Sequence, residues 1–141
     1  MIYRRATLDD IPEIIEVVTR MVLGTKFRPP TAKKLSQIVQ NYYTEGVWFE
    51  GQLIAFMCGR LSECFMNDEV NAYESGLFVA PEFRGSRVAV RLVRNFETWA
   101  KARGAQNVWM GQSVGHRIFK TMSFYHHLGY DCQGFNACKP L

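Results

Sequence analysis

The chain has 141 residues, and 48% of them are hydrophobic, so it is long enough to bury one core. Its formal net charge of +4 is scattered among carboxylates, and it shows no basic stripe of the kind that binds nucleic acid. No apolar stretch is long enough to cross a bilayer, and the residues after Met1 lack the apolar segment of a signal peptide. We therefore expect one domain over residues 1–141, in a cytoplasmic protein that binds neither membrane nor nucleic acid.

The first third of the chain is predicted to form a strand and two helices. Residues 2–6 have the pattern of a short strand, and Thr7 with the acidic residues after it is typical of a helix N-cap. Apolar residues recur every three or four positions from about 8 to 23, which predicts a helix with one buried face. After two prolines, Thr31 caps a second helix that is expected to end near residues 45–46.

The middle of the chain changes to a strand pattern. Apolar residues at 47–49 and 52–57 flank Glu50-Gly51, and this combination predicts a hairpin with a tight turn. A polar loop around residues 62–69 then leads to a long strand at about 70–79.

The last part of the chain alternates helices and strands. A helix is predicted at about 86–103, a strand at 107–112, a helix that ends at Leu128, and a last strand at about 130–138. The resulting order, β-α-α-β-β-β-α-β-α-β, predicts an α/β fold with a mixed, mostly antiparallel sheet and helices on both faces.

The four cysteines are expected to be free thiols, because disulfides are rare in a reducing compartment. Cys58 lies in an apolar run and is predicted to be buried. Five residues separate Cys58 from Cys64 and Cys132 from Cys138, whereas structural zinc sites commonly have two to four. We therefore predict no metal site.

The clearest chemical signal lies at residues 77–89, where an apolar strand turns through a loop of small residues into a helix. The first N–H groups of a helix have no partner within it, and the helix dipole is positive there, so this place suits a phosphate. Gly85, Ser86 and Ala89 would let a diphosphate approach the backbone closely. The alternative is an ordinary strand-to-helix turn.

This segment resembles the phosphate-binding motif of the GCN5-related N-acetyltransferase (GNAT) family, Arg/Gln-x-x-Gly-x-Gly/Ala. Residues 79–84, Val-Ala-Pro-Glu-Phe-Arg, are similar to the family's lead-in, and Arg84 and Ala89 match the two ends of the motif. Arg87 replaces the central glycine. A left-handed backbone would be strained by arginine, so we expect a helical conformation there, in which the N–H still faces a phosphate.

Two further segments resemble the family, namely Phe-Tyr-His-His-Leu-Gly-Tyr at 124–130 and the opening strand and helix at 2–10. The likeness covers the order of elements across nearly the whole chain. It implies a GNAT-like fold, acetyl-CoA as cosubstrate and an amine acceptor of unknown identity, and it allows a homodimer. It also implies that the coenzyme is held by Leu77, Phe78, Val79, Arg84, Gly85, Ser86, Arg87, Val88, Ala89 and Ser113, the last near a position where members often carry a coenzyme-contacting asparagine.

The resemblance also provides two catalytic candidates. Tyr125 matches a tyrosine that protonates the departing thiolate, and a phenol suits this role because its pKa, about 10, exceeds that of a thiol. Glu74, on the long strand, is the best candidate for the base, and some members use a carboxylate on this strand. The interpretations left open are a packing role for Tyr125, a solvated Glu74, and a histidine base at His116, His126 or His127.

Together these expectations predict direct transfer from a thioester to an amine in a ternary complex, with no covalent enzyme intermediate. Two rival interpretations remain, a module that binds acyl-CoA without transferring the acyl group and a structural protein, such as a phage-associated one, whose pocket has decayed.

Charged residues outside the motif have two interpretations each. Three arginines share one helix face and would meet either the coenzyme's phosphates or solvent, namely Arg87, Arg91 and Arg94. The segments at 24–31 and 62–69 are expected to border the acceptor pocket. The second of them carries acidic side chains that would either attract a cationic amine or be solvated, namely Glu63, Asp68 and Glu69.

Overall fold

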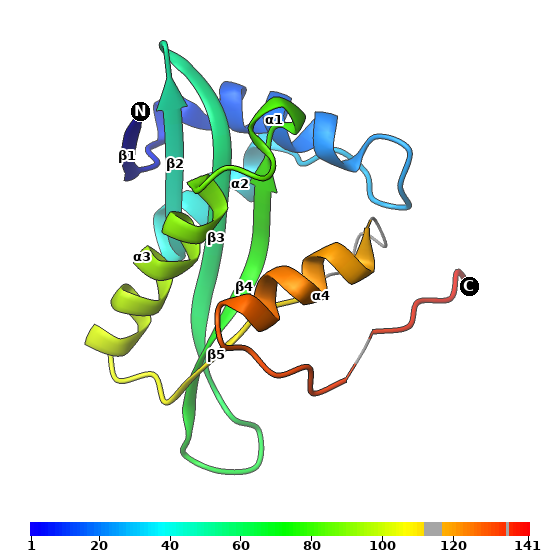
Figure 1. Cartoon of the computed structure of the whole chain (residues 1–141). Helices are drawn as coiled ribbons and strands as arrows, with labels where there is room; N and C mark the ends of the chain where they lie inside the picture. The colour runs from blue at the N-terminus through cyan, green and yellow to red at the C-terminus, as the bar shows by residue number, and fades with distance from the viewer. Residues whose placement is uncertain (112–116, 135) are drawn as a thin grey trace.

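The computed structural model describes residues 1–111, 117–134 and 136–141, and a five-stranded sheet forms its centre (Figure 1). The strands lie in the order of the sequence, and every neighbouring pair is antiparallel except the last, β4 with β5, which is parallel. The expected mixed, mostly antiparallel sheet is therefore confirmed. The strands are β1 (Ile2–Arg5), β2 (Tyr43–Phe49), β3 (Gln52–Glu63), β4 (Val70–Val79) and β5 (Asn107–Trp109).

Helices cover both faces of the sheet, as the order of elements predicted. Figure 1 shows α1 and α2 behind the sheet and α3 and α4 in front of it. Within the described ranges, no helix is both long enough and apolar enough to span a membrane. The helices are η1 (Leu8–Asp10), α1 (Ile11–Val22), α2 (Ala32–Asn41), η2 (Pro81–Phe83), α3 (Val88–Ala102) and α4 (Ile118–His127), where η marks a short 3-10 turn.

Two apolar clusters hold these layers together, one on each face of the sheet. Behind it, Ile14 of α1 and Leu35 of α2 pack in the cluster that contains Phe56. In front, the apolar stripe of α3, centred on Phe96, packs in the cluster that contains Met57. At Gly59 an added Cβ would lie 2.5 Å from the Phe96 ring, so glycine lets α3 approach β3 closely.

The second helix is shorter than predicted, and the prediction that it continues to residues 45–46 is wrong. The helix ends at Asn41, and β2 begins at Tyr43, which pairs with Gly59 of the long strand β3. Glu45 is buried in β2, where its carboxylate accepts hydrogen bonds from the Tyr43 hydroxyl (2.6 Å) and the Asn95 side chain (2.8 Å). These partners come from the tertiary fold, which the local pattern of apolar residues does not contain.

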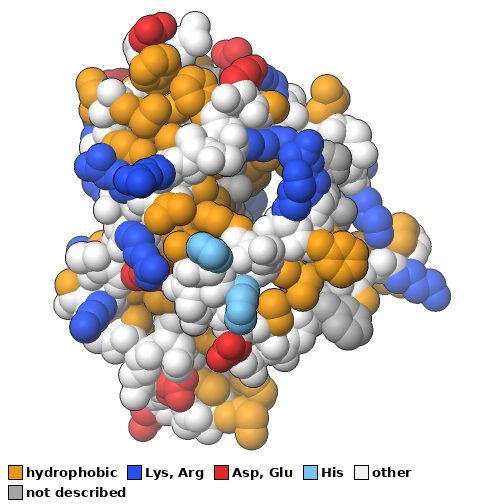
Figure 2. Space-filling model, in the orientation of Figure 1, with side chains coloured by type: hydrophobic (Ala, Val, Ile, Leu, Met, Phe, Trp, Pro, Cys, Tyr) orange, Lys and Arg blue, Asp and Glu red, His pale blue; other side chains and the backbone are white. Residues whose placement is uncertain are grey.

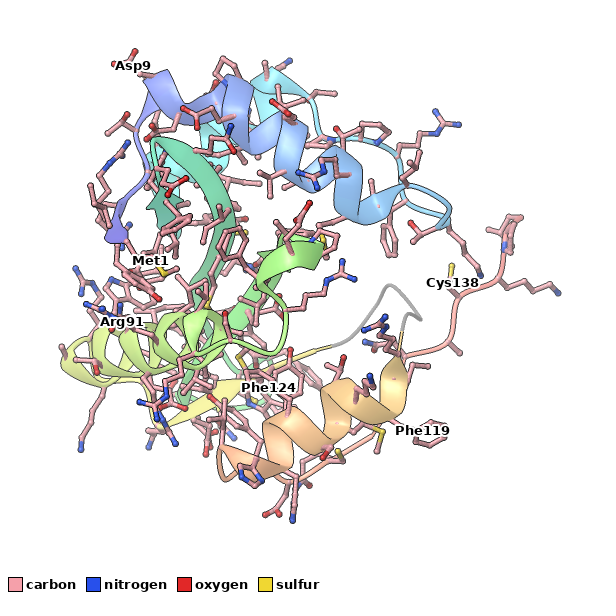
Figure 3. The ribbon with its side chains drawn as sticks, turned by 45° about the horizontal axis from the view of Figure 1, so that its top comes forward. Met1, Asp9, Arg91, Phe119, Phe124 and Cys138 are labelled. Atoms are coloured by element: carbon pink, nitrogen blue, oxygen red, sulfur yellow. The ribbon has the colours of Figure 1, made fainter. Side chains whose placement is uncertain are left out.

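The predicted last strand at 130–138 is also wrong, because residues 130–134 and 136–138 form no strand. The segment is mostly exposed and runs towards the loop after α1, where the Lys26 ammonium lies 3.4 Å from the Cys138 carbonyl oxygen (Figure 3). A strand needs a partner edge of similar length, and β5 has only three residues. Gly134 further weakens any strand here.

Candidate functional site

The strands β4 and β5 pair only at their beginnings and then diverge. The parallel ladder joins Asn71–Tyr73 to Asn107–Trp109, whereas β4 continues to Val79. A bulge lies just past the end of the ladder, because Glu74 pairs with Gly59 and Gly76 with Cys58, which leaves Ser75 as an extra residue. Beyond Tyr73, the edge of β4 that faces β5 therefore has no ladder partner among the residues described. The predicted coenzyme contacts Leu77, Phe78 and Val79 lie along this open edge.

After β4, the chain turns through η2 into α3, and this turn exposes backbone amides. Gly85 has a φ of +79°, and an added Cβ there would contact nothing within 4 Å, so glycine is required by the backbone conformation and not by space. The amide of Val88 donates to the Ser86 hydroxyl at 3.3 Å. The amides of Gly85, Arg87, Ala89 and Val90 have no protein partner within the described ranges. Four donors therefore remain open beside the positive end of the α3 dipole.

Arg87 adopts the helical conformation expected of it, with φ −74° and ψ −1°. The position therefore accepts a side chain where the family motif has glycine, without backbone strain. Its side chain is exposed at the start of α3. The other two arginines of that helix face have partners elsewhere, since Arg91 lies over the Tyr3 ring at 4.0 Å and Arg94 pairs with Glu97 at 2.8 Å.

Arg84, the first residue of the motif, points back into the protein. Its Nε donates to the Val79 carbonyl oxygen at 3.3 Å, and one of its terminal nitrogens lies 2.9 Å from the Met21 sulfur. A second contact joins the same elements, because Arg20 of α1 pairs with Glu82 of η2 at 2.9 Å. Arg84 in this arrangement fixes η2 against α1 and the end of β4.

The two predicted catalytic residues both bind the backbone of one residue, Gly111. The hydroxyl of Tyr125, on α4, donates to the Gly111 carbonyl oxygen at 2.9 Å, and the Gly111 amide donates to Glu74 Oε2 at 3.2 Å. Gly111 follows β5, on the far side of the gap from Glu74. The structure thus brings a phenol and a carboxylate to the same residue, close to the point where β4 and β5 separate.

The environment of this pair shifts the pKa of both groups upward. Burial raises the pKa of Glu74 to about 7, and the Gly111 hydrogen bond offsets only part of this effect. Burial also raises the pKa of the Tyr125 hydroxyl, and the nearby charge of Glu74 raises it further. Glu74 can therefore exchange a proton near neutral pH, whereas Tyr125 stays protonated.

The position of Tyr125 is fixed by contacts at the end of α4. Gly129 follows this helix with a left-handed φ of +92°, as its sequence position predicted, and the amide of Tyr130 donates to the Tyr125 carbonyl oxygen at 3.0 Å. The Tyr130 hydroxyl donates to Glu97 of α3 at 2.8 Å, which ties the two front helices together. Gly111 was missed in the sequence analysis, because nothing in its sequence context distinguishes it from an ordinary loop glycine.

Two of the remaining histidine and serine candidates, Ser113 and His116, lie outside the described residues. His126 and His127 are exposed, and Figure 2 shows histidine side chains on the outer surface of this face. Neither histidine side chain makes a hydrogen bond within the described part of the chain, whereas Glu74 shares Gly111 with Tyr125.

The cysteines are free, as expected, and the predicted core thiol Cys58 is buried. Burial and the charge of Glu74 raise the pKa of the Cys58 thiol to about 12, so it is a poor nucleophile. Across residues 1–111, 117–134 and 136–141, no group of three or more potential ligands gathers around a point where a metal ion would fit.

The two segments predicted to border the acceptor pocket lie at different ends of the sheet. The α1–α2 loop, which contains residues 24–31, is on the side of η2, whereas the loop at 64–69 joins the far ends of β3 and β4 (Figure 1). In that second loop, Glu69 accepts a hydrogen bond from Asn107 at 2.7 Å. Glu69 thus holds the start of β5, while Glu63 and Asp68 are exposed.

Comparisons with known proteins agree with this geometry. A family model described as the acetyltransferase (GNAT) family matches residues 19–130. A comparison with curated protein sequences finds no significant match.

Similar folds occur among solved structures. A mutant of the BH1408 protein from Bacillus halodurans is 22% identical, with a TM-score of 0.84 and coverage of 100% of this chain and 99% of that one. A transcriptional regulator from Bacillus halodurans C-125 is 17% identical, with a TM-score of 0.83 and coverage of 99% of both chains. A glucosamine-6-phosphate N-acetyltransferase from Arabidopsis thaliana is 17% identical, with a TM-score of 0.79 and coverage of 99% and 97%. At these identities the likeness shows a shared fold.

Proposed function

Because this chain belongs to the acetyltransferase (GNAT) family and is an acyltransferase, we propose that it moves an acetyl group from acetyl-CoA to an amine by direct attack in a ternary complex. One observation carries the proposal. Open amides at the start of α3 lie beside an unpaired edge of β4, and the same edge leads to Glu74 and Tyr125. This arrangement supports the proposal, because a diphosphate bound at the amides would direct the thioester along the edge of β4 towards Glu74 and Tyr125.

In this proposal, the coenzyme is held mainly by backbone groups. The amides of Gly85, Arg87 and Ala89 and the helix dipole bind its diphosphate, and the exposed Arg87 side chain adds a positive charge. The open edge at 77–79 offers N–H and C=O groups to the chain that carries the thioester. Arg84 acts indirectly, because its guanidinium holds η2 in place.

Glu74 is proposed as the base that accepts a proton from the attacking amine. With a pKa of about 7, roughly half of Glu74 is ionised at neutral pH, and this carboxylate is a stronger base than an ordinary glutamate. The neutral amine attacks the thioester carbon with its lone pair, and Glu74 accepts the proton that the nitrogen loses. As the new C–N bond forms, the C–S bond breaks and its electron pair leaves on sulfur.

Tyr125 is proposed as the acid that gives a proton to the departing thiolate. In the structure its hydroxyl donates to the Gly111 carbonyl oxygen, so this proton must turn from Gly111 to sulfur. The two steps are coupled electrostatically. Because the negative charge of Glu74 raises the pKa of Tyr125, protonation of Glu74 by the amine makes Tyr125 a stronger acid when the thiolate appears.

The experiment that tests this proposal combines binding with turnover. Calorimetric titration with acetyl-CoA and with CoA is expected to give saturable heat, and a panel of amines is then tested for acetylation. No saturable heat at about 1 mM coenzyme would refute the proposal. Saturable binding without transfer to any amine would instead favour the rival function, a module that binds acyl-CoA without transferring the acyl group.

A further inference from the structure

A groove lies at the opposite end of α3 from the open amides. It has a volume of about 360 Å³ and forms where the end of α3 meets the start of β2 and the last part of β3. A helix of 15 residues is about 22 Å long, so this groove is well separated from the proposed diphosphate site. Its lining residues are Asn41, Tyr42, Tyr43, Arg60, Leu61, Trp99 and Arg103.

Two arginines from different elements line this groove, and a third contacts two of its lining residues. Arg60 comes from β3 and Arg103 follows α3. Arg5 of β1 holds its guanidinium over the Tyr43 ring at 4.4 Å and donates to the Tyr42 carbonyl oxygen at 3.0 Å. None of the three lies within 4.0 Å of a carboxylate in the described ranges. Burial lowers the pKa of Arg5, and the nearby charge of Arg103 lowers it further, so two like charges act on each other here.

The nearest acid and the helix dipole compensate this charge only in part. Glu45 acts on Arg5, but its two oxygens already accept hydrogen bonds from Tyr43 and Asn95. The partial negative charge at the end of α3 stabilises a cation such as Arg103. Neither Glu45 nor the helix dipole compensates the charge of Arg60, so the groove retains a net positive charge.

The floor of the groove is aromatic and held in place. The Trp99 ring is stacked on Phe96 at 5.5 Å and tilted against Tyr43 at 5.0 Å, and Arg103 lies 4.9 Å over its centre. Because Phe96 is fully buried, the position of the indole is fixed by the core. Phe96 covers one face of the indole and Arg103 lies over the ring, so a planar ring that enters the groove meets the Arg103 guanidinium, on which aromatic rings can stack.

From these observations we infer that the groove binds a small aromatic phosphomonoester, such as a nucleoside monophosphate. A phosphate dianion can accept bidentate hydrogen bonds from two guanidinium groups, here Arg60 and Arg103, whereas a carboxylate is satisfied by one. The volume lies near the lower limit of small-molecule sites and leaves room for a ring beside the phosphate. The ring rests against Tyr42 and the face of the Arg103 guanidinium. The site is independent of the acyl-transfer proposal.

The test uses 1-naphthyl phosphate, a probe too simple to imitate the diphosphate of the coenzyme. Calorimetry with the full chain is expected to show one saturable site below about 1 mM. Inorganic phosphate and 1-naphthol are each expected to bind at least about 10-fold more weakly, because the first has no aromatic ring and the second has no phosphate. Arg60→Gln and Arg103→Gln should each weaken binding about 10-fold or more, since a hydrogen bond to a charged group is lost.

Matched controls locate the binding event. Arg28→Gln removes an exposed arginine far along the sequence, and Gly85→Ala alters the other end of α3; both should leave naphthyl phosphate affinity unchanged. The groove assignment is overturned if no saturable heat appears, if Gly85→Ala weakens binding while the groove variants do not, or if Arg28→Gln weakens it as much as they do. Thermal unfolding of each variant confirms that the surface substitutions leave the fold intact.

Discussion

The turns that lead into α1 and α3 use their polar groups in opposite ways. At the start of η1, just before α1, the carboxylate of Asp10 accepts hydrogen bonds from the Thr7 amide (2.8 Å) and hydroxyl (3.1 Å) and from both terminal nitrogens of Arg4 (2.8 Å each). At the start of α3, one amide donates to the Ser86 hydroxyl, whereas four others have no partner within the described ranges. We therefore expect the η1 turn to contribute to stability and the start of α3 to bind the coenzyme.

The largest expected effect comes from the chemistry beside the open start. Glu74→Gln removes the proposed base while keeping a side chain of the same shape, and kcat is expected to fall at least about 100-fold. In the native protein, kcat/KM should rise as pH increases through about 7, because only ionised Glu74 accepts a proton. The variant should show a flat profile over this range. A profile identical to that of the native protein would remove Glu74 from the mechanism.

The same substitution can be checked without measuring activity. A carboxyl whose pKa is raised on folding binds more protons in the native state between about pH 4.5 and 7, so native stability falls as pH rises through that range. The loss is at most about 3 kcal/mol at neutral pH. Denaturant unfolding should show this decline in the native protein and not in Glu74→Gln. A decline of equal size in both would mean that another group titrates.

The next largest effect is expected at the η1 turn before α1, and it should concern stability alone. Hydrogen bonds from Arg4 lower the pKa of Asp10 to about 2, so the ionised carboxylate contributes about 2 kcal/mol to folding. This contribution is present above about pH 4 and is lost as pH falls towards 2. Asp10→Asn should lower the unfolding free energy by about this amount at pH 7 and leave coenzyme affinity unchanged. Weaker coenzyme binding in a folded Asp10→Asn protein would contradict the division between the two helix starts.

Tyr125→Phe should produce a smaller effect that is mainly catalytic. The variant keeps the buried ring and loses the hydroxyl that donates to Gly111, so kcat should fall about 10-fold or more while coenzyme affinity stays nearly constant. The loss of one hydrogen bond should cost about 1 kcal/mol of stability. Unchanged kcat would leave Tyr125 with a packing role only.

The smallest effect is expected from Gly85→Ala, which alters the turn that carries the unpaired amides before α3. Space is available for the added methyl group, so the cost arises from the φ of +79° and amounts to about 1–2 kcal/mol. If the backbone relaxes to relieve this strain, the Gly85 amide turns away and coenzyme affinity falls several-fold. Gly24→Ala is a matched control, because Gly24 has the same φ and the same free space but lies after α1. Equal coenzyme affinity in both variants would show that the turn at Gly85 does not shape the site.

The parts of the fold that could be predicted are those that local patterns determine. The strand expected at about 70–79 coincides with β4, the predicted cap at Thr7 contacts Asp10, and Arg87 takes the helical conformation that an arginine requires. Each depends on spacing or backbone preference within a few residues.

What could not be predicted depends on residues that are distant in sequence. The burial of Glu45 in β2 depends on Asn95, 50 residues away, so the local pattern favoured a longer helix. The expected strand at 130–138 had an apolar pattern but no partner edge, and strands form in pairs. In the site, Glu74 and Tyr125 were identified separately, but their meeting at Gly111 follows from the way β4 and β5 diverge.

The central claim concerns the open amides of α3, and amide NMR of the uniformly ¹⁵N-labelled protein tests it most directly. As CoA is added, the resonances of Gly85, Arg87 and Ala89 are expected to shift in a saturable way, because their N–H groups acquire acceptors. The Thr7 amide, which already donates to Asp10, should stay unchanged. Saturable binding of CoA that leaves all three α3 resonances in place would contradict the account.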